Sequence, residues 1–172
     1  MPSPMPMPMP SPAAVASTLN RTTTVTTTVG PLGNQYVGYY ESWRDPYTSS
    51  ASSSRIANLP PYVTQVLLSF FRPGSTYAGG VTFEGTGLIF SSPPEVVKES
   101  IALLKSKNPG TRVLLSVGGA TYSEWSNLNA AAAATFVSEF GLDGIDIDFE
   151  PQGADCQSNN GVVSCATDQP YI

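Results

Sequence analysis

The strongest constraint on the fold is that apolar strand patterns alternate with helical patterns along the chain. Residues 65–71 and 112–119 are near-continuous apolar runs, as in strands that are buried on both faces. Each run is followed by a segment with helical composition and helix end signals, residues 93–107 and 123–140. Buried strands that alternate with helices form parallel βαβ units. The sequence therefore predicts an α/β domain built on a parallel sheet.

A further strand pattern, at residues 143–150, alternates acidic with apolar side chains. Because side chains alternate between the two faces of a strand, Asp146, Asp148 and Glu150 are expected to share one face. Successive carboxyl groups on that face are about 7 Å apart, at a rise of about 3.3 Å per residue. Their mutual repulsion in a low dielectric raises the proton affinity of at least one of them. A carboxylic acid that keeps its proton near neutral pH meets the requirement for a general acid.

Spacing alone leaves three interpretations of these acids open. The first is a set of catalytic carboxylates. The second is a set of oxygen ligands for a metal ion, although a helix-loop-helix calcium site would need polar residues and a turn-forming glycine where this strand is apolar. The third is a structural cluster, in which each unpaired buried charge costs several kcal/mol. The chain has no histidine, which excludes Ser-His-Asp and Cys-His catalysis.

Three motifs, in chain order, resemble those of family 18 glycoside hydrolases, the chitinases and their relatives. Residues 36–43 resemble the first strand of that family, and Ser-Val-Gly-Gly at 116–119 resembles its second motif. The pattern Asp-x-x-Asp-x-Asp-x-Glu at 143–150 matches its active-site signature at all four acids. The resemblance covers residues 35–151. It implies that the chain contains about the first four β/α units of a (β/α)8 TIM barrel.

The resemblance also implies roles for individual residues. Glu150 is expected to protonate the glycosidic oxygen and then to act as base toward water, in a retaining mechanism in which the substrate supplies the nucleophile. Asp148 is expected to orient the N-acetyl group and stabilise the cyclised intermediate, and Asp146 to share a proton with Asp148. No metal or organic cofactor is expected. The implied supporting residues are Asp143, Ser116, Gly118 and Gly119, and the implied substrate-binding residues are Tyr39, Trp43 and Phe70.

Some of these residues have an interpretation that needs no ligand. Gly118 and Gly119 are expected to leave space near the sugar, but they are also typical of a tight turn at a strand end. Trp43 is expected to stack on a sugar ring, but aromatic side chains are commonly packed in a core. These alternatives are open at the level of sequence.

The implied function is hydrolysis of β-1,4 bonds in N-acetylglucosamine polymers, with chitin or its oligosaccharides as partner. The alternative is a non-catalytic relative that binds these sugars. Barrels of this kind take about 250 residues, and only residues 151–172 follow Glu150. We therefore expect the N-terminal part of a longer protein or a truncated product, whose activity as given is open. Half a barrel would expose two apolar edges, available for aggregation or for pairing with another copy.

The N-terminal segment is unlike the predicted barrel segment at 35–172. Residues 1–34 are rich in Pro, Met and Thr, and we predict a disordered linker there. No cationic start and apolar core of a secretory signal are evident, so an extracellular or cell-wall location is implied by the family alone. An extracellular family also implies a local disulfide between Cys156 and Cys165, in the loop predicted after the acidic strand.

Charge and hydropathy exclude two classes of partner. The net charge is −5 and the isoelectric point is near 4.5. An acidic chain is a poor match for nucleic acid or for an anionic membrane. No apolar run is long enough to span a bilayer. The sequence leaves the oligomeric state open.

Overall fold

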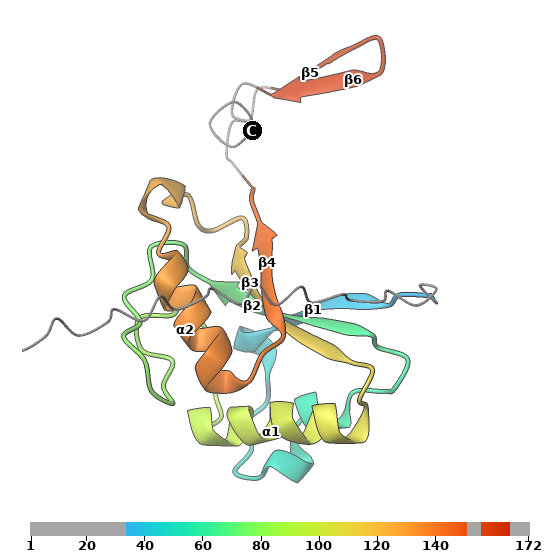
Figure 1. Ribbon diagram of the computed structural model, residues 1–172, viewed down its shortest axis with the longest axis vertical. Helices are drawn as coiled ribbons and strands as arrows, with labels where there is room; N and C mark the ends of the chain where they lie inside the picture. Colours follow the sequence, from blue (N-terminus) through green and yellow to red (C-terminus); the bar gives the residue numbers. More distant parts are fainter. Residues whose placement is uncertain (1–33, 151–155, 166–172) are drawn as a thin grey trace, which may run out of the picture. The chain divides into compact units, whose positions relative to one another are not determined.

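The computed structural model describes residues 34–150 and 156–165 (Figure 1). Nearly all of the predicted linker, up to residue 33, lies outside the described residues, as do residues 151–155 and 166–172. No helix in the described ranges has both the length and the apolar character needed to cross a membrane.

Four strands form one sheet in chain order: β1 (Val37–Glu41), β2 (Gln65–Phe71), β3 (Arg112–Gly118) and β4 (Gly144–Asp148). Every neighbouring pair is parallel. The register places Asp146 beside Ser116 and Asp148 beside Gly118. Sequential parallel strands joined through helices are the arrangement of successive barrel units. β1 and β4 are the two edges of this sheet, and β4 carries the acidic motif.

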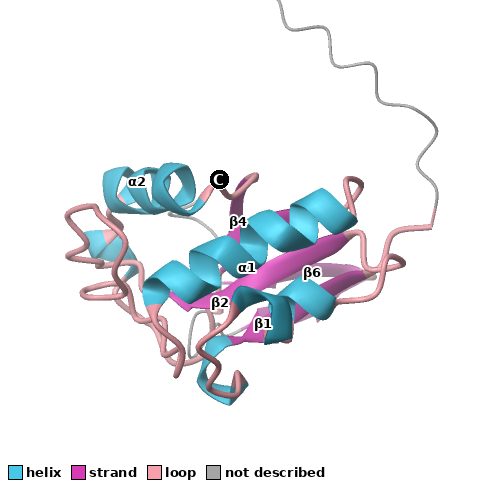
Figure 2. Ribbon diagram, turned by 90° about the horizontal axis from the view of Figure 1, so that it is seen from below, coloured by secondary structure: helices cyan, strands magenta, loops and turns pink. Residues whose placement is uncertain are grey.

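Two helices, α1 (Pro94–Lys107) and α2 (Ala130–Phe140), cover the same face of the sheet (Figure 2). The side chain of Asn129 caps α2 by accepting a hydrogen bond from the N–H of Ala132. Gly141 ends α2 with a left-handed φ of 66°, the conformation typical of a glycine C-cap. Four short 3-10 helices lie in the connections: Ser42–Arg44, Ala51–Ser53, Ile56–Asn58 and Trp125–Asn127.

The hydrophobic core lies between the helices and the sheet. Phe136 and Phe140 of α2 stack in it with ring centroids 4.1 Å apart. Fully burying one such side chain contributes roughly 1.5–3 kcal/mol. The core uses one face of each strand, so the other face is left for the acids. The strand and α1 residues in this core include Val66, Leu68, Val113, Leu115, Val117, Val97, Ile101 and Leu104.

The structure differs from the sequence expectations in two segments. Residues 123–140 are not one helical region, because the Asn129 cap sets the start of α2 and a separate 3-10 turn precedes it. The segment predicted as a loop after the acidic strand contains an antiparallel hairpin, β5 (Cys156–Asn159) and β6 (Val162–Cys165). Its turn has positive φ at Asn160 and Gly161, as in a type I′ turn. Strands of four residues carry too little pattern to be recognised in a sequence.

Candidate active site

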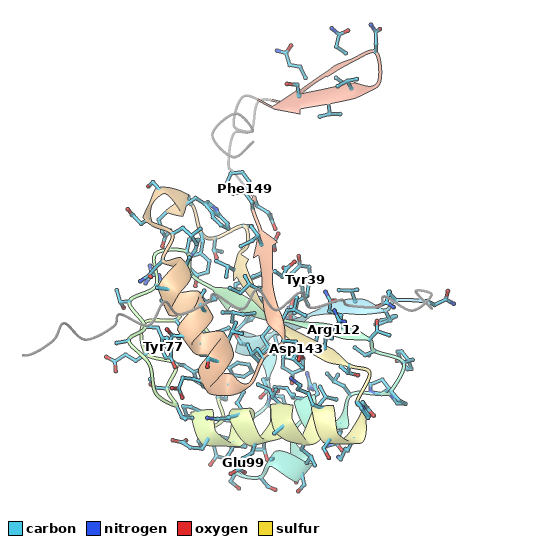
Figure 3. All side chains as sticks on the ribbon, viewed as in Figure 1. Tyr39, Tyr77, Glu99, Arg112, Asp143 and Phe149 are labelled. Carbon is cyan, nitrogen blue, oxygen red and sulfur yellow. The ribbon has the colours of Figure 1, made fainter. Side chains whose placement is uncertain are left out.

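The acids of the motif are distributed along β4 and just beyond its end. Asp146 and Asp148 lie in the strand, and Glu150 follows it by two residues. Figure 3 shows Asp143 and Phe149 at opposite ends of β4. The carboxyl ends of parallel strands meet at one edge of the sheet, so Asp148 and Glu150 lie where the connecting loops converge.

A set of side-chain hydrogen bonds joins three of the four acids to their neighbours. The fully buried Ser116 donates from Oγ to Oδ2 of Asp146 at 2.8 Å. The carboxyl group of Asp148 is hydrogen-bonded to the side chain of Glu150 and accepts a second bond from the Tyr39 phenol. The side chain of Asp148 therefore interacts with both Glu150 and Tyr39.

The electrostatics of this set act mainly on Asp148. Burial raises the pKa of its carboxyl group above the ordinary value, and the negative charges of Glu150 and Asp146 raise it further. The hydrogen bond from Tyr39 opposes this rise. The pKa of the Tyr39 phenol is itself raised, first by burial and then by the three acids, so Tyr39 keeps its proton and donates it. Asp148 is thus the carboxyl group whose proton affinity the cluster increases.

Asp143 has different partners. Its Oδ1 accepts a hydrogen bond from Lys105 Nζ at 2.6 Å, and its Oδ2 accepts one from the backbone N–H of Val113 at 2.8 Å. Its own N–H donates to the carbonyl of Val113 at 2.8 Å. These contacts join the start of β4 to β3 and α1. The described contacts of Asp143 therefore position the acidic strand, at the end away from Glu150.

Gly118 and Gly119 allow β3 to approach β4 and the aromatic residues closely. Both have positive φ, 114° and 88°. A Cβ on Gly118 would lie 2.1 Å from the carbonyl oxygen of Asp148, and one on Gly119 would lie 2.8 Å from the Phe70 ring. The N–H of Gly119 donates to that same carbonyl at 2.8 Å. Protein atoms thus occupy the space that side chains would need, which gives both glycines a structural role at this strand end.

An aromatic group flanks the acids. The Phe70 ring lies 5.6 Å from that of Tyr39 and stacks on Trp43 with centroids 5.9 Å apart. Trp43 keeps 45% of its surface exposed, so part of its ring is free for a ligand. A cavity of about 380 Å³ opens beside these rings, of the size and lining of a small-ligand site. Its lining residues are Trp43, Phe70, Gly87, Ile89, Ala120, Thr121 and Tyr122.

Several of the residues around this cavity were not identified from the sequence. Tyr122 lines it, and the guanidinium carbon of Arg72 lies 6.0 Å from the centre of the Tyr122 ring. Arg72 also forms an ion pair of 3.0 Å with Glu124, which links the loop after β2 to the loop after β3. Trp125 is buried against Gly118 and the Phe149 ring. Only the position of Tyr122 and Trp125 shortly after the Ser-Val-Gly-Gly motif could have suggested them.

The metal-ligand interpretation finds no geometric support in the described ranges. Within residues 34–150 and 156–165, no three side chains of His, Cys, Asp or Glu come together as a metal ion would require. The acids instead pair with each other, with a serine and with a tyrosine.

Comparisons with known proteins identify the class. The family model described as Glycosyl hydrolases family 18 matches residues 35–169. The chain therefore belongs to family 18 of the glycosyl hydrolases, and its four parallel strands with their helices are part of a (β/α)8 barrel. This confirms the family and the fold class predicted from the three motifs.

The similar curated proteins are chitinases. A chitinase of Plasmodium falciparum (isolate 3D7) is 33% identical over 129 residues, which cover 68% of this chain and 32% of that protein. Exochitinase 1 of Streptomyces olivaceoviridis is 32% identical over 122 residues, which cover 66% and 20%. A solved GH18 chitinase from Pseudoalteromonas aurantia is 25% identical, with a TM-score of 0.45 and coverage of 70% and 42%. The chain thus spans about a third or less of the length of these two curated relatives.

Proposed function

We propose that this chain carries the catalytic acids of a chitinase, which hydrolyses β-1,4 bonds between N-acetylglucosamine units with retention of configuration. The observation that carries the proposal is the hydrogen-bonded contact of Asp148 with both Glu150 and Tyr39, with Ser116 holding Asp146 behind it. This group lies at the carboxyl end of a barrel strand, where the active sites of TIM barrels lie.

The first chemical step breaks the bond between C1 of one sugar and the bridging oxygen. Glu150 gives its proton to that oxygen, which keeps the bonding electrons and leaves as a hydroxyl group. The carbonyl oxygen of the N-acetyl group on the same sugar forms the new bond to C1. The product is a cyclised intermediate with a positive charge. Glu150 is exposed at the end of the acidic motif, so it can reach a substrate from this position.

Asp148 assists this step by position and charge. Its carboxyl group orients the N-acetyl group and stabilises the positive charge that develops on it. Burial and the negative charges of Glu150 and Asp146 raise the pKa of Asp148, which lies next to the group that must donate a proton. Tyr39 holds Asp148 from the other side, and Asp146 shares a proton with it.

The second step returns the enzyme to its starting state. Water attacks C1, the bond to the N-acetyl oxygen breaks, and Glu150 takes the proton from the water. Two successive displacements at C1 restore its original configuration. Trp43 and Phe70 supply the aromatic surface on which a neighbouring sugar stacks. Since chitin is an extracellular polymer, we also propose that the protein acts outside the cell or in a cell wall.

Turnover of a fluorogenic N-acetylglucosamine oligomer tests the proposal. We expect activity from the 172-residue chain, and a loss of at least about 100-fold in Glu150→Gln, because a general acid contributes about 10²–10⁴ in rate. Glu99→Gln is the matched control, since it makes the same change on the exposed surface of α1 and should keep full activity. Retention of chitin in a pull-down without turnover would instead support the sugar-binding alternative.

A further inference from the structure

The cavity beside Trp43 and Phe70 has a lining of flat rings and aliphatic groups. The two rings are stacked on each other, and part of the Trp43 ring is open to a ligand. Ile89 and Ala120 add aliphatic surface. None of the described residues that line this cavity has a charged side chain. The cavity is therefore suited to a neutral ligand that has both a flat apolar face and a small apolar group.

Two polar groups lie next to each other at one end of this lining, the hydroxyl of Tyr122 and the carbonyl of Gly87. They are 3.5 Å apart, whereas the usual distance of an O–H···O hydrogen bond is about 2.7–2.8 Å. Each group can therefore form a better hydrogen bond with a ligand than with the other. Burial raises the pKa of the Tyr122 phenol, so it keeps its proton and can donate.

Arg72 fixes the position of Tyr122 at this wall. Its guanidinium carbon lies 6.0 Å from the centre of the Tyr122 ring, a cation–π distance. Its side chain pairs with Glu124 at 3.0 Å, and its backbone N–H donates to the carbonyl of Thr86 at 2.8 Å. Because the ion pair is partly exposed, it adds little to the stability of the fold. Its main consequence is that the loop with Gly87 and the loop with Tyr122 are held together.

We propose that this cavity binds the acetamido group of a sugar unit, and that Arg72 is the positioning residue that holds Tyr122 against that group. The Tyr122 hydroxyl donates to the acetamido carbonyl, and the Gly87 carbonyl accepts from the acetamido N–H. The methyl group packs on Ile89 and Ala120. The inference rests on the proposed chitinase function, and it adds a second place at which an N-acetylated sugar is selected over one with a free amine.

A free amine fits this wall poorly. Its protonated form needs a carboxylate or several acceptors when it leaves water. The carboxylate of Glu124 is already paired with Arg72, and the guanidinium charge repels an ammonium group. An acetamido group is neutral, and its donor and acceptor match the carbonyl and the hydroxyl. The sugar unit bound here is not the one that meets the acids, because neither Tyr39 nor Asp148 lines this cavity.

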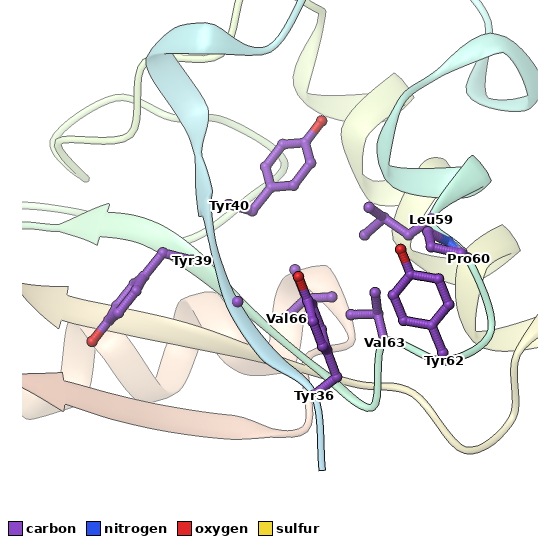
Figure 4. Close-up of a pocket in the computed structure, with 9 residues that line it drawn as sticks. Tyr36, Tyr39, Tyr40, Leu59, Pro60, Tyr62, Val63 and Val66 are labelled. Atoms are coloured by element: carbon purple, nitrogen blue, oxygen red, sulfur yellow. The ribbon is translucent and has the colours of Figure 1, made fainter. Parts of the chain in front are cut away.

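A second cavity offers a matched control. It has a volume of about 270 Å³ and lies beside β1 (Figure 4). Tyr62 lines it, is 64% exposed and has its ring 5.4 Å from that of Tyr36. The ring of Tyr39, which contacts Asp148, points away from this cavity. Tyr62→Phe therefore removes a phenol hydroxyl from a cavity on the other side of β1 from the Tyr39 ring, and it should not change sugar binding.

Tryptophan fluorescence of the full 172-residue chain tests the proposal. The chain has two tryptophans; Trp43 is exposed in the cavity and Trp125 is buried, so a sugar in the cavity should change the emission of Trp43. The probes are the tetramer of N-acetylglucosamine and the fully deacetylated tetramer. We expect the wild type to bind the first at least about tenfold more tightly. Tyr122→Phe should reduce this ratio about fivefold, the effect of losing one hydrogen bond, and Tyr62→Phe should leave it unchanged.

Arg72→Gln tests the positioning role. It removes the charge beside Tyr122, so the ratio should fall here as well. Arg112→Gln is the matched control, because Arg112 is exposed at the start of β3, at the other end of the strand from the cavity. Far-UV spectra and melts of the four variants should match those of the wild type. A merely structural effect would weaken the binding of both tetramers equally and would leave the ratio unchanged.

An unchanged ratio in Tyr122→Phe or in Arg72→Gln would overturn the proposal. So would a wild-type chain that binds neither tetramer or that prefers the deacetylated one. Turnover is a separate readout: both variants should raise KM and leave kcat unchanged, because the cavity does not adjoin the reacting bond. Selective binding without turnover would support this inference and count against hydrolysis, whereas turnover with an unchanged ratio would do the reverse.

Discussion

The carboxyl groups of Asp148 and Glu150 are hydrogen-bonded to each other. Burial raises the pKa of Asp148, and the charges of Glu150 and Asp146 raise it further. A raised pKa means that the charged form of Asp148 is disfavoured in the folded chain, so the ionised group lowers the stability of the fold.

Asp148→Asn should change how the stability of the folded chain depends on pH. The folded chain binds the Asp148 proton more tightly than the unfolded chain does, because the pKa of Asp148 is raised by folding. The contribution of Asp148 to wild-type stability is therefore fully present below its ordinary pKa of 3.8, and it is lost as the pH rises through the raised pKa. Asn has no charge to lose. We expect the variant to melt at a higher temperature than the wild type near neutral pH, with the difference vanishing below about pH 3.8. Thermal melts across this pH range measure the effect.

Asp143→Asn is the control for that comparison and should have the opposite sign. Asp143 forms an ion pair of 2.6 Å with Lys105, and Asn removes its charge. We expect a lower melting temperature at neutral pH. If Asp148→Asn also lowered the melting temperature there, the acids would not be in the strained arrangement described.

Ser116→Ala should destabilise the chain through Asp146. Ser116 is fully buried and donates to Asp146 at 2.8 Å, so its loss leaves a half-buried carboxylate without that donor. The expected loss in free energy of unfolding is about 1–3 kcal/mol, measured by urea denaturation. Ser100→Ala is a matched control: Ser100 is equally buried, but its hydroxyl bonds to the Val96 carbonyl within α1. That carbonyl keeps its helical partner, so the change should cost less. Equal losses in both variants would contradict the proposed role of Ser116.

The sequence predicts the fold where its signals are local. The apolar runs of β2 and β3, the glycine that ends α2 and the alternation in β4 each have a short-range physical cause, and the structure has all of them. The motifs predicted the family, which the family model confirms. The roles assigned to the acids and aromatic residues remain predictions.

Features that depend on distant residues could not be predicted. Asp143 is bonded to Lys105, 38 positions away, and no periodicity in either segment indicates that contact. The 55% exposure of Ile147 is a second example, since the alternation in β4 predicts a covered apolar face. Burial depends on what lies beyond the strand's edge, and local pattern holds no information on that neighbour.

Gly118→Ala should be strongly destabilising. Its φ of 114° is unfavourable for any side chain, and the new Cβ would lie 2.1 Å from the carbonyl oxygen of Asp148. Backbone strain of about 1–3 kcal/mol and overpacking of about 1–3 kcal/mol add to one another. Gly110→Ala is the control, because a Cβ there meets no atom within 4 Å. Chemical denaturation should show a large loss for the first variant and little change for the second. A tolerated Gly118→Ala would mean that β3 and β4 are farther apart than described.

A disulfide between Cys156 and Cys165 is the prediction that the hairpin makes testable. Their side chains lie outside what the structure describes, but their Cα positions are direct partners in the antiparallel register of β5 and β6. Such partners are about 4.5 or 5.5 Å apart, within the range that a disulfide spans. Closing so short a segment stabilises it by about 2–3 kcal/mol. We expect protein from an oxidising compartment to show no free thiol under denaturing conditions, and a mass lower by two hydrogens than after reduction. Two reactive thiols in that protein would rule the bridge out, since the chain has no other cysteine to pair with either one.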